Sequence, residues 1–481
     1  MTGKEDILKR SIIRHHTALS TGEYSAEQLT LAYFDAIERE NPTVNAYVCL
    51  CKDRAILAAK ASDKRRSQNV TLGVLDGIPF AAKDNISAKG LPLSCASKIL
   101  SDYVAPYDAT VISLLEAEGA ILLGKTNLDE FAMGTGSESS CFGRVKNPLD
   151  LSRVAGGSSG GSAAAVCAGL ACFALGSDTG GSVRQPAAFC GLYGLRPTYS
   201  AISRYGLVGF APSLDTVGII ARNAYDCACV LDTLAIRDPL DATSQSFEKK
   251  DFFCNISKDI RGITVALVKE SAKDLSKEAT YAFDLCVDML KMLGAKLKIV
   301  SLPSFESAYA AYYTISSAEA SSNLSRFDGV RYGYRAYRYD GIESLYVKSR
   351  SQGLGNEVKR RILFGALALS SGFRDDIYVR AINARNRIAK ELDDIMKNAD
   401  ILLIPTASTV AYVAGAKKSS RFDAYIADDL LCVPASLAGL PSLSVPISDG
   451  KELPCGIQLV GSRFEEAKIF NVAEALGNFM R

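Results

Sequence analysis

Histidine is nearly absent from this sequence. Only two occur among 481 residues, side by side at His15 and His16 near the start of the chain. A Ser-His-Asp hydrolase needs a histidine beside its nucleophile to take up the serine proton. Both histidines belong to a stretch that we expect to be helical, far along the chain from the glycine- and serine-rich loops described below. If the chain is a serine hydrolase, its base is therefore expected to be another residue type.

Metal-binding cysteine patterns are missing as well. The sequence has 13 cysteines but no Cys-x-x-Cys pair, and the closest pairs, Cys49/Cys51 and Cys227/Cys229, are too tightly spaced for a zinc knuckle. The odd number and the scatter of these cysteines do not fit a disulfide framework. We expect buried, reduced thiols in a reducing cytoplasm and no metal site.

Long apolar runs and blocks of like charge are also lacking. No segment reaches the ~20 apolar residues that cross a bilayer, and residues 1–11 are charged without the apolar centre of a signal peptide. The net charge is +2, and basic residues cluster only at 64–66 and 359–361. These absences predict a chain without a membrane anchor and without a broad polyanion-binding surface.

The chain does contain short apolar segments that alternate with amphipathic helices. The first helix is expected to begin at a capping box formed by Ser25 and Gln28 and to end at Asn41–Pro42. The apolar stretch 163–175 is interpreted as a buried helix, and a further helix is expected around 282–293. Buried strands are expected at 120–124, 263–268, 297–300, 401–404, 443–445 and 456–460.

This alternation predicts an α/β fold with a mixed, largely buried central sheet flanked by helices. No fixed-period repeat and no Pro/Ser-rich linker divides the chain. We therefore expect a single large domain over residues 1–481, although the length alone would suggest two or three domains. Within it, helices are expected at about 1–65, and a mostly helical, more polar subregion is expected at about 305–395 on the substrate side.

Two glycine- and serine-rich loops carry the candidate chemistry. The first is Gly156–Ser162, with the sequence GGSSGGS, and the second is Asp178–Ser182, with the sequence DTGGS. A Thr-Gly-Gly-Ser turn can leave several backbone N–H groups pointing the same way, which suits a developing oxyanion beside an attacking serine. Ser182 is thus a candidate nucleophile. A plain turn or an anion-binding loop would show the same pattern.

Lys83 is the candidate base. It follows the apolar run 78–82 and should stand at the end of a buried strand. A free lysine titrates near pH ~10.4, and burial can lower this pKa by ~3–5 units. A neutral Lys83 could accept a proton, and Ser158 could relay that proton from Ser182. Taken alone, Lys83 could equally be a structural lysine paired with a carboxylate.

Together these motifs resemble the signature of the amidase signature family. The resemblance includes Lys83, the Ser158 loop with the alanines after it, and the run GSDTGGSVRQPA that contains Ser182. It implies one α/β domain around a large mixed sheet and acyl transfer from an amide. It also implies that Ser182 is the nucleophile, Ser158 a cis serine and Lys83 the base. The implied oxyanion hole is the backbone of Thr179, Gly180, Gly181 and Ser182.

Four further segments resemble one branch of that family, the glutaminase subunits of tRNA-dependent amidotransferases. These segments are residues 129–134, 319–333, 357–362 and 429–441. The resemblance implies that Arg361 and Asp429 hold free glutamine, with Tyr312 nearby. An arginine suits the α-carboxylate and an aspartate the α-ammonium group. Whether Arg360 or Arg361, and Tyr312 or Tyr313, makes the contact stays open at this stage.

The same resemblance implies two partners, the B and C subunits of such an amidotransferase. Ammonia would pass to the B subunit, which uses ATP and Mg²⁺ and holds most of the misacylated tRNA, and the small C subunit would complete a heterotrimer. No cofactor or metal is expected in this chain. The choice between Glu-tRNA(Gln) and Asp-tRNA(Asn) stays open.

Two other hypotheses remain. One is a stand-alone amidase of the same family that acts on a small or aryl amide without partners. The other is a non-enzymatic protein whose glycine loops cradle an anion. No Gly-x-x-x-x-Gly-Lys-Ser/Thr or Gly-x-Gly-x-x-Gly motif placed between a strand and a helix favours the second of these.

Overall fold

A computed structural model describes residues 7–245, 251–416, 430–447 and 453–480. Its main feature is an 11-stranded sheet with parallel and antiparallel neighbours. In spatial order the strands are β1 (Tyr47–Leu50), β3 (Ile121–Thr126), β2 (Pro79–Lys83), β6 (Phe173–Asp178), β8 (Thr216–Ala221), β7 (Tyr193–Arg196), β12 (Ser442–Ile447), β13 (Cys455–Val460), β11 (Ile401–Pro405), β9 (Thr264–Val268) and β10 (Lys296–Val300). A separate pair is formed by β4 (Lys146–Asn147) and β5 (Asp150–Val154). The predicted α/β class with a mixed central sheet is confirmed.

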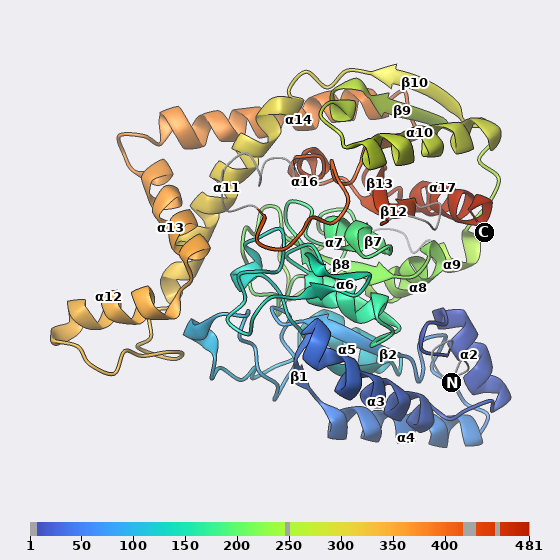
Figure 1. The fold of residues 1–481 in the computed structure, drawn as a ribbon, viewed down its shortest axis with the longest axis horizontal. Coiled ribbons are helices and arrows are strands. Elements are labelled where there is room, and N and C mark those ends of the chain that lie inside the picture. The colour runs from blue at the N-terminus through green and yellow to red at the C-terminus, as the bar shows by residue number, and fades with distance from the viewer. Residues whose placement is uncertain (1–6, 246–250, 417–429, 448–452, 481) are drawn as a thin grey trace.

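Helices flank the sheet throughout (Figure 1). The helices α2 (Ile12–Thr21), α3 (Ala26–Val44) and α4 (Lys52–Ser67) gather beside β1 and β2 near the start of the chain. Further along are α5 (Thr110–Ala117), α6 (Gly160–Cys167), α7 (Arg184–Phe189), α8 (Ala224–Leu234), α9 (Phe252–Asn255), α10 (Lys277–Met292), α16 (Val433–Ala438) and α17 (Glu466–Phe479). No helix among the described residues is long and apolar enough to cross a membrane.

A helical region extends away from the sheet on one side of the molecule, shown in yellow to orange in Figure 1. It consists of α11 (Ala308–Asn323), α12 (Gly341–Gly353), α13 (Asn356–Leu369) and α14 (Arg380–Met396). Its apolar side chains belong to the same buried cluster as residues of the sheet, for example Tyr312 of α11 and Leu402 of β11. The region is therefore packed onto the sheet and carries side chains toward it.

The first long helix ends later than the sequence suggests. The capping box is present, because the N–H of Gln28 donates to Ser25 Oγ at 3.0 Å and Gln28 Oε1 accepts from the Ser25 N–H at 2.9 Å. The expected end at Asn41–Pro42 is wrong, since α3 continues to Val44. A proline in the last turn costs one intrahelical hydrogen bond without stopping the chain. Asn45, in the left-handed conformation, then closes the helix by donating its N–H to Asn41 O at 2.8 Å.

The stretch 163–175 is not one helix, so that prediction is also wrong. Helix α6 ends at Cys167, and Gly169 follows with a φ of 74°. This conformation favours glycine and turns the chain, and the N–H of Leu170 donates to Ala165 O at 2.8 Å. Strand β6 then begins at Phe173, between β2 and β8. The sheet thus continues directly after the helix that carries the first loop.

Three glycines at the centre of the sheet allow the second loop to approach closely. Gly176 of β6, Gly218 of β8 and Gly194 of β7 all face Val183, the residue after Ser182. A Cβ at Gly176 would lie 2.8 Å from Val183 Cγ2, one at Gly218 2.9 Å from the same atom, and one at Gly194 2.8 Å from Val183 O. Larger residues on these strands would push the loop away from the sheet.

Candidate active site

Lys83 is the last residue of β2, as predicted, and its amine is surrounded by hydroxyl groups. Lys83 Nζ lies 2.7 Å from Ser158 Oγ, 2.9 Å from Ser159 Oγ and 2.9 Å from Ser177 Oγ. The side chain is fully buried, and it forms no ion pair with any described residue. Burial lowers the pKa of Lys83 to about 7, although the nearby charges of Asp129, Asp178 and Asp215 oppose the shift.

A second fully buried lysine, Lys125, differs from Lys83 because it has a carboxylate partner. Lys125, on the adjacent strand β3, lies 3.0 Å from Asp84 Oδ1 in a fully buried ion pair. Asp84 follows Lys83 in sequence, yet its carboxylate pairs with the neighbouring strand's lysine. The interpretation of Lys83 as a structural lysine paired with a carboxylate is therefore wrong. Lys83 is placed to exchange protons with hydroxyl groups.

The hydrogen bonds around Lys83 indicate the direction in which protons can move. Ser159 Oγ donates to Ser177 O at 3.2 Å and therefore accepts from Lys83. Asn85 Nδ2 donates to Ser177 Oγ at 2.9 Å. A neutral lysine has two N–H donors and one lone pair, so it can accept a proton from one of its three hydroxyl neighbours while donating to the other two. Ser158 can be the hydroxyl that gives its proton to Lys83.

The first loop is fixed through its backbone. The Gly157–Ser158 peptide bond is cis. The N–H of Gly157 donates to Gln185 Oε1 at 2.9 Å, and Gln185 Nε2 donates to Thr135 O at 3.0 Å. Gln185 belongs to α7, the helix that follows Ser182, so one side chain ties the two loops together. A Cβ at Gly157 would lie 2.2 Å from Asp129 Oδ2, which explains the need for glycine there.

The second loop brings Ser182 beside the first. The N–H of Ser159 donates to Ser182 O at 3.1 Å, and Ser182 is 6% exposed. The carbonyl groups of Gly181 and Ser182 both accept hydrogen bonds, and Gly181 O accepts from the N–H of Gln185 at 2.9 Å. Across the described part of the chain, none of the four N–H groups from Thr179 to Ser182 donates a hydrogen bond. They are available for a developing oxyanion.

Buried charges hold the second loop in place. Asp178, at the end of β6, lies 2.9 Å from Arg184 and 3.0 Å from Arg196. Burial acts in the opposite direction, but the two guanidinium groups keep the pKa of Asp178 well below its usual value. Asp215 accepts from Thr179 Oγ1 at 2.6 Å, and burial raises its pKa. Thr179 is thereby anchored, and its N–H keeps a defined direction.

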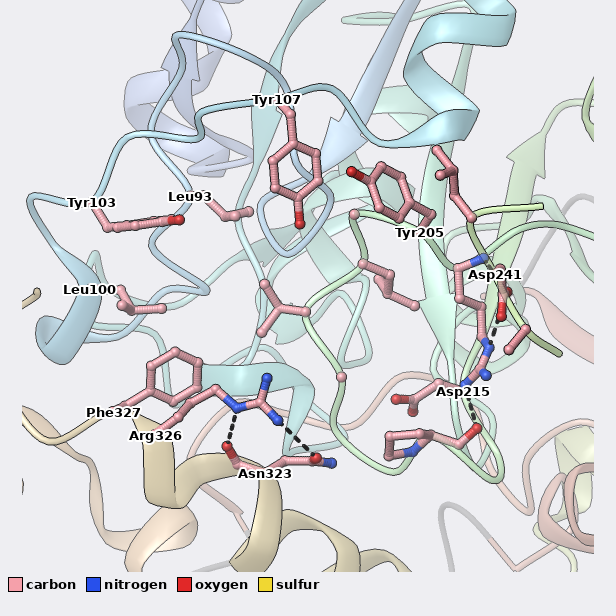
Figure 2. A pocket seen from close by; sticks show the side chains of 18 of the residues that line it. Leu93, Leu100, Tyr103, Tyr107, Tyr205, Asp215, Asp241, Asn323, Arg326 and Phe327 are labelled. Atoms are coloured by element: carbon pink, nitrogen blue, oxygen red, sulfur yellow. Dashed lines mark hydrogen bonds and ion pairs between the residues drawn. The ribbon is translucent and has the colours of Figure 1, made fainter. Parts of the chain in front are cut away.

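Asp215 also lines a pocket of about 420 Å³ that opens beside this loop (Figure 2). Aromatic side chains, among them Tyr103, Tyr107, Tyr205 and Phe327, surround the pocket, and Arg326 lies at its edge, hydrogen-bonded to Asn323 O at 2.9 Å. The carboxylate of Asp215 connects the pocket to the loop, because Asp215 lines the pocket and accepts the hydrogen bond from Thr179 Oγ1. The residues that line the pocket do not include Ser158 or any residue of the second loop, so Asp215 makes the connection to the loop indirect.

Tyr312 of α11 lies against the second loop. A Cβ at Gly180 would be 2.7 Å from Tyr312 Cζ and 2.8 Å from its hydroxyl oxygen. Tyr313 instead stacks on Arg361, whose guanidinium carbon lies 4.9 Å from the Tyr313 ring centroid. The same guanidinium lies 5.3 Å from the ring of Phe210, whose N–H donates to Asp215. Tyr312 thus contacts the candidate oxyanion loop, and Tyr313 orients Arg361.

The two candidate arginines differ in burial. The side chain of Arg361 is 2% exposed and that of Arg360 is 42% exposed, although both pair with Glu357 on α13. Arg361 Nε lies 2.9 Å from Glu357 Oε1, which fixes the guanidinium between the two rings. Asp429, the third expected glutamine contact, lies outside the described residues.

Sequence reasoning does not single out Ser159, Ser177, Asn85, Gln185 or Asp215. Ser159 and Ser177 both occur within the quoted motifs. Ser177 reaches Lys83 because β6 pairs with β2, and Ser159, just before α6, lies beside Lys83 with its hydroxyl bonded to Ser177 O. Gln185 lies within the quoted run GSDTGGSVRQPA and Asp215 lies outside the quoted motifs, but the roles of both depend on contacts with residues distant in sequence.

Comparison with known proteins agrees with this geometry. The sequence profile of the family described as Amidase matches residues 28–470. A protein of Clostridium acetobutylicum, named as A subunit 2 of glutamyl-tRNA(Gln) amidotransferase, is 47% identical over 474 residues, which cover 98% of this chain and 99% of that protein. The A subunit of the glutamyl-tRNA(Gln) amidotransferase of Thermosynechococcus vestitus is 45% identical over 96% of each chain.

Solved structures show the same fold. The A subunit of the glutamyl-tRNA(Gln) amidotransferase of Thermotoga maritima superimposes with a TM-score of 0.81 at 37% identity, covering 98% of this chain and 95% of that one. A peptide amidase of Stenotrophomonas maltophilia superimposes with a TM-score of 0.83 at 29% identity, over 98% and 97%. The family profile and the relatives match this chain along nearly its whole sequence, and Lys83 lies among serine hydroxyls beside a loop whose described N–H groups donate no hydrogen bond. This chain belongs to the amidase family.

Proposed function

We propose that this chain is the glutaminase subunit of a tRNA-dependent amidotransferase and that it hydrolyses glutamine to glutamate and ammonia. The observation that carries the proposed chemistry is the 2.7 Å contact between the buried amine of Lys83 and Ser158 Oγ. The choice of glutamine is supported by relatives named as amidotransferase subunits, which are 44–47% identical over nearly the full chain.

The reaction would begin with proton transfer. Neutral Lys83 takes the proton of Ser158, Ser158 takes the proton of Ser182, and Ser182 Oγ attacks the amide carbon. The N–H groups from Thr179 to Ser182 stabilise the oxyanion. The amide nitrogen receives a proton from Lys83 by way of Ser158 and leaves as ammonia. Water, deprotonated by the same relay, then hydrolyses the acyl ester on Ser182 and releases glutamate.

Substrate recognition would depend on the helical region. Arg361 is the expected partner of the glutamine α-carboxylate, since it is buried, oriented by Glu357 and held between Tyr313 and Phe210. Tyr312 would contact the substrate beside Gly180, and Asp429 would bind the α-ammonium group. Burial distinguishes Arg361 from Arg360, and contact with the loop distinguishes Tyr312 from Tyr313.

The partners belong to the proposal as well. The B subunit would use ATP and Mg²⁺ to activate the misacylated tRNA and would receive the ammonia, and the C subunit would stabilise the heterotrimer. The net charge of +2 is consistent with a tRNA held mainly by the partner. The chain itself would need no cofactor and would work in the cytoplasm. Whether it serves Glu-tRNA(Gln), Asp-tRNA(Asn) or both depends on the synthetases present.

Ammonia release tests this proposal. The purified chain is given glutamine or a neutral aryl amide, alone and after co-expression with candidate B and C subunits, with charged tRNA and ATP added. We expect a preference for glutamine and turnover that rises in the full assembly. Equal turnover of neutral amides, indifferent to partners and tRNA, would identify a stand-alone amidase instead.

A further inference from the structure

Cys167 and Cys190 lie together at the ends of the two helices that carry the catalytic loops. Helix α6 begins at Gly160, two residues after Ser158, and ends at Cys167. Helix α7 begins at Arg184, two residues after Ser182, and Cys190 follows its last residue. The side chains of Cys167 and Cys190 interact with each other, and both line the same surface hollow. The loops therefore lie at one end of this helix pair and the two thiols at the other.

The pair is accessible from solvent on one side. Both cysteines line a surface hollow of about 480 Å³ together with Lys9 and Arg222. Cys167 is partly exposed, whereas Cys190 is buried. An incoming reagent therefore meets Cys167 first, and Cys190 lies behind it. This arrangement separates an attacking thiol from a resolving thiol.

The chemistry around Cys167 favours its thiolate. Interaction with the Cys190 side chain lowers the pKa of Cys167, burial opposes the shift, and the positive charges of Arg222 and Lys9 assist it. The guanidinium of Arg222 also donates to Val166 O, next to Cys167 in the chain. The positive charges of Arg222 and Lys9 beside Cys167 also attract a reagent that carries negative charge.

Cys190 connects this pair to the catalytic loop. Its thiol donates to Ala155 O at 3.5 Å, and Ala155 directly precedes the GGS segment that ends at Ser158. A disulfide has no S–H group, so oxidation removes this hydrogen bond from a buried carbonyl. It also fixes the end of α6 to the end of α7. Both effects act on the segments that position Ser158 and Ser182.

We propose that Cys167 and Cys190 form a thiol-modification site that reacts with a small anionic disulfide and reversibly slows the amidase reaction. The Cys167 thiolate attacks one sulfur of the reagent, forming a mixed disulfide and releasing one thiolate. Cys190 loses its proton to solvent and attacks the sulfur of Cys167, releasing the second thiolate. The two cysteines are oxidised by two electrons in total, and the reagent is reduced to two thiols.

The probe is glutathione disulfide, added to the reduced full-length chain. Intact mass and peptide mapping report the modification, and amide hydrolysis is followed in parallel. We expect a loss of about two mass units, a peptide linking Cys167 to Cys190, and activity that falls severalfold and returns with a dithiol reductant. The mass readout does not depend on the proposed substrate, so it separates a failure of this proposal from a failure of the proposed function.

Matched variants complete the test. Cys167→Ser should keep its basal activity and lose the response to glutathione disulfide. Cys254→Ser, which removes an exposed cysteine in α9, should respond like the unmodified chain. Cys190→Ser retains a donor for Ala155 O and should stop at a glutathione adduct on Cys167. Adducts confined to other cysteines, or a Cys167–Cys190 bridge that leaves activity unchanged, would overturn the proposal.

Discussion

Lys83 Nζ and Ser158 Oγ lie 2.7 Å apart inside the protein, and both residues are fully buried. The pair joins the end of β2 to a loop that begins more than 70 residues later. Because burial lowers the pKa of Lys83, the amine can lose its proton near neutral pH. The contact therefore couples a base to a hydroxyl group without a histidine.

The first prediction concerns pH. Burial lowers the pKa of Lys83 to about 7, so the amine is neutral above pH 7 and protonated below it. Only the neutral form can accept the serine proton. We expect kcat/KM for glutamine to rise about tenfold per pH unit up to pH ~7 and then to level off. Steady-state kinetics between pH 5 and pH 9 check this.

Removal of Lys83 is the control for that profile. Lys83→Ala should retain the folded structure by circular dichroism and lose nearly all turnover, because members of a relay act as a unit. Its residual activity should lack the inflection near pH 7. An unchanged inflection in Lys83→Ala would assign the titration to another group.

The second prediction separates the two neighbouring arginines of α13. Arg361→Ala removes the buried guanidinium and should raise the KM for glutamine about 10- to 100-fold, as expected when a charged hydrogen-bond partner is lost. Arg360→Ala, at the exposed position, is the matched control and should change KM less than about twofold. Turnover of a neutral amide should be similar in both variants. A larger effect at Arg360 would reverse the assignment.

The third prediction concerns the contact between Gly180 and Tyr312. Gly180→Ala places a methyl group 2.7 Å from Tyr312 Cζ, so either the loop or the tyrosine must move. Misplaced N–H donors should lower kcat on the order of 10²-fold. Gly372→Ala is the control, because a Cβ at that position meets nothing within 4 Å. Wild-type kcat in Gly180→Ala would show that the loop tolerates the displacement.

The fourth prediction concerns Glu130, which supports the start of α13. Its buried carboxyl group accepts a hydrogen bond from the N–H of Gly355 at 2.9 Å and another from Ser97 Oγ. Burial raises the pKa of Glu130 to about 7, above its unfolded value near 4.5. The folded protein therefore binds the proton more tightly than the unfolded chain does. This contribution to stability is complete below pH ~4.5 and disappears as the pH rises through ~7.

Glu130→Gln mimics the protonated form and tests that sign. The free energy of unfolding should depend less steeply on pH between 4.5 and 7 in the variant, with a difference on the order of 2 kcal/mol across the range. Urea denaturation at several pH values gives the comparison. Parallel curves for the two proteins would mean that Glu130 does not titrate in this range.

Much of the fold can be predicted from local patterns, and the errors have physical reasons. Strands β9 and β11 are apolar runs, so their predicted ranges are close to the observed ones. Strand β10 also lies close to its predicted range, but the prediction that it is buried is wrong, because it forms the edge of the sheet and Ile299 is 74% exposed. Strand β6 is mistaken for helix because its small residues continue the apolar pattern of α6. Helix α3 runs past Pro42 because a proline near a helix end removes only one hydrogen bond.

The candidate site depends more on long-range pairing. Lys83, Ser158 and Ser182 can be related to one another through the family resemblance, since no local pattern links them. Ser177 lies within the quoted motif, but its contact with Lys83, like the contact of Asp215 with Thr179, arises only when β6 pairs with β2 and β8. The glycines at 176, 194 and 218 matter through Val183, a contact that no spacing in the sequence encodes.

The central claim is that Ser182 forms the acyl-enzyme, and covalent trapping tests it most directly. The chain is incubated with a glutamine analogue that carries a diazoketone in place of the amide, and the labelled peptide is located by mass spectrometry. We predict one label on Ser182, protection by excess glutamine, and no label in Ser182→Ala with an intact fold. Labelling that persists in Ser182→Ala, or that falls on a cysteine, would contradict the account.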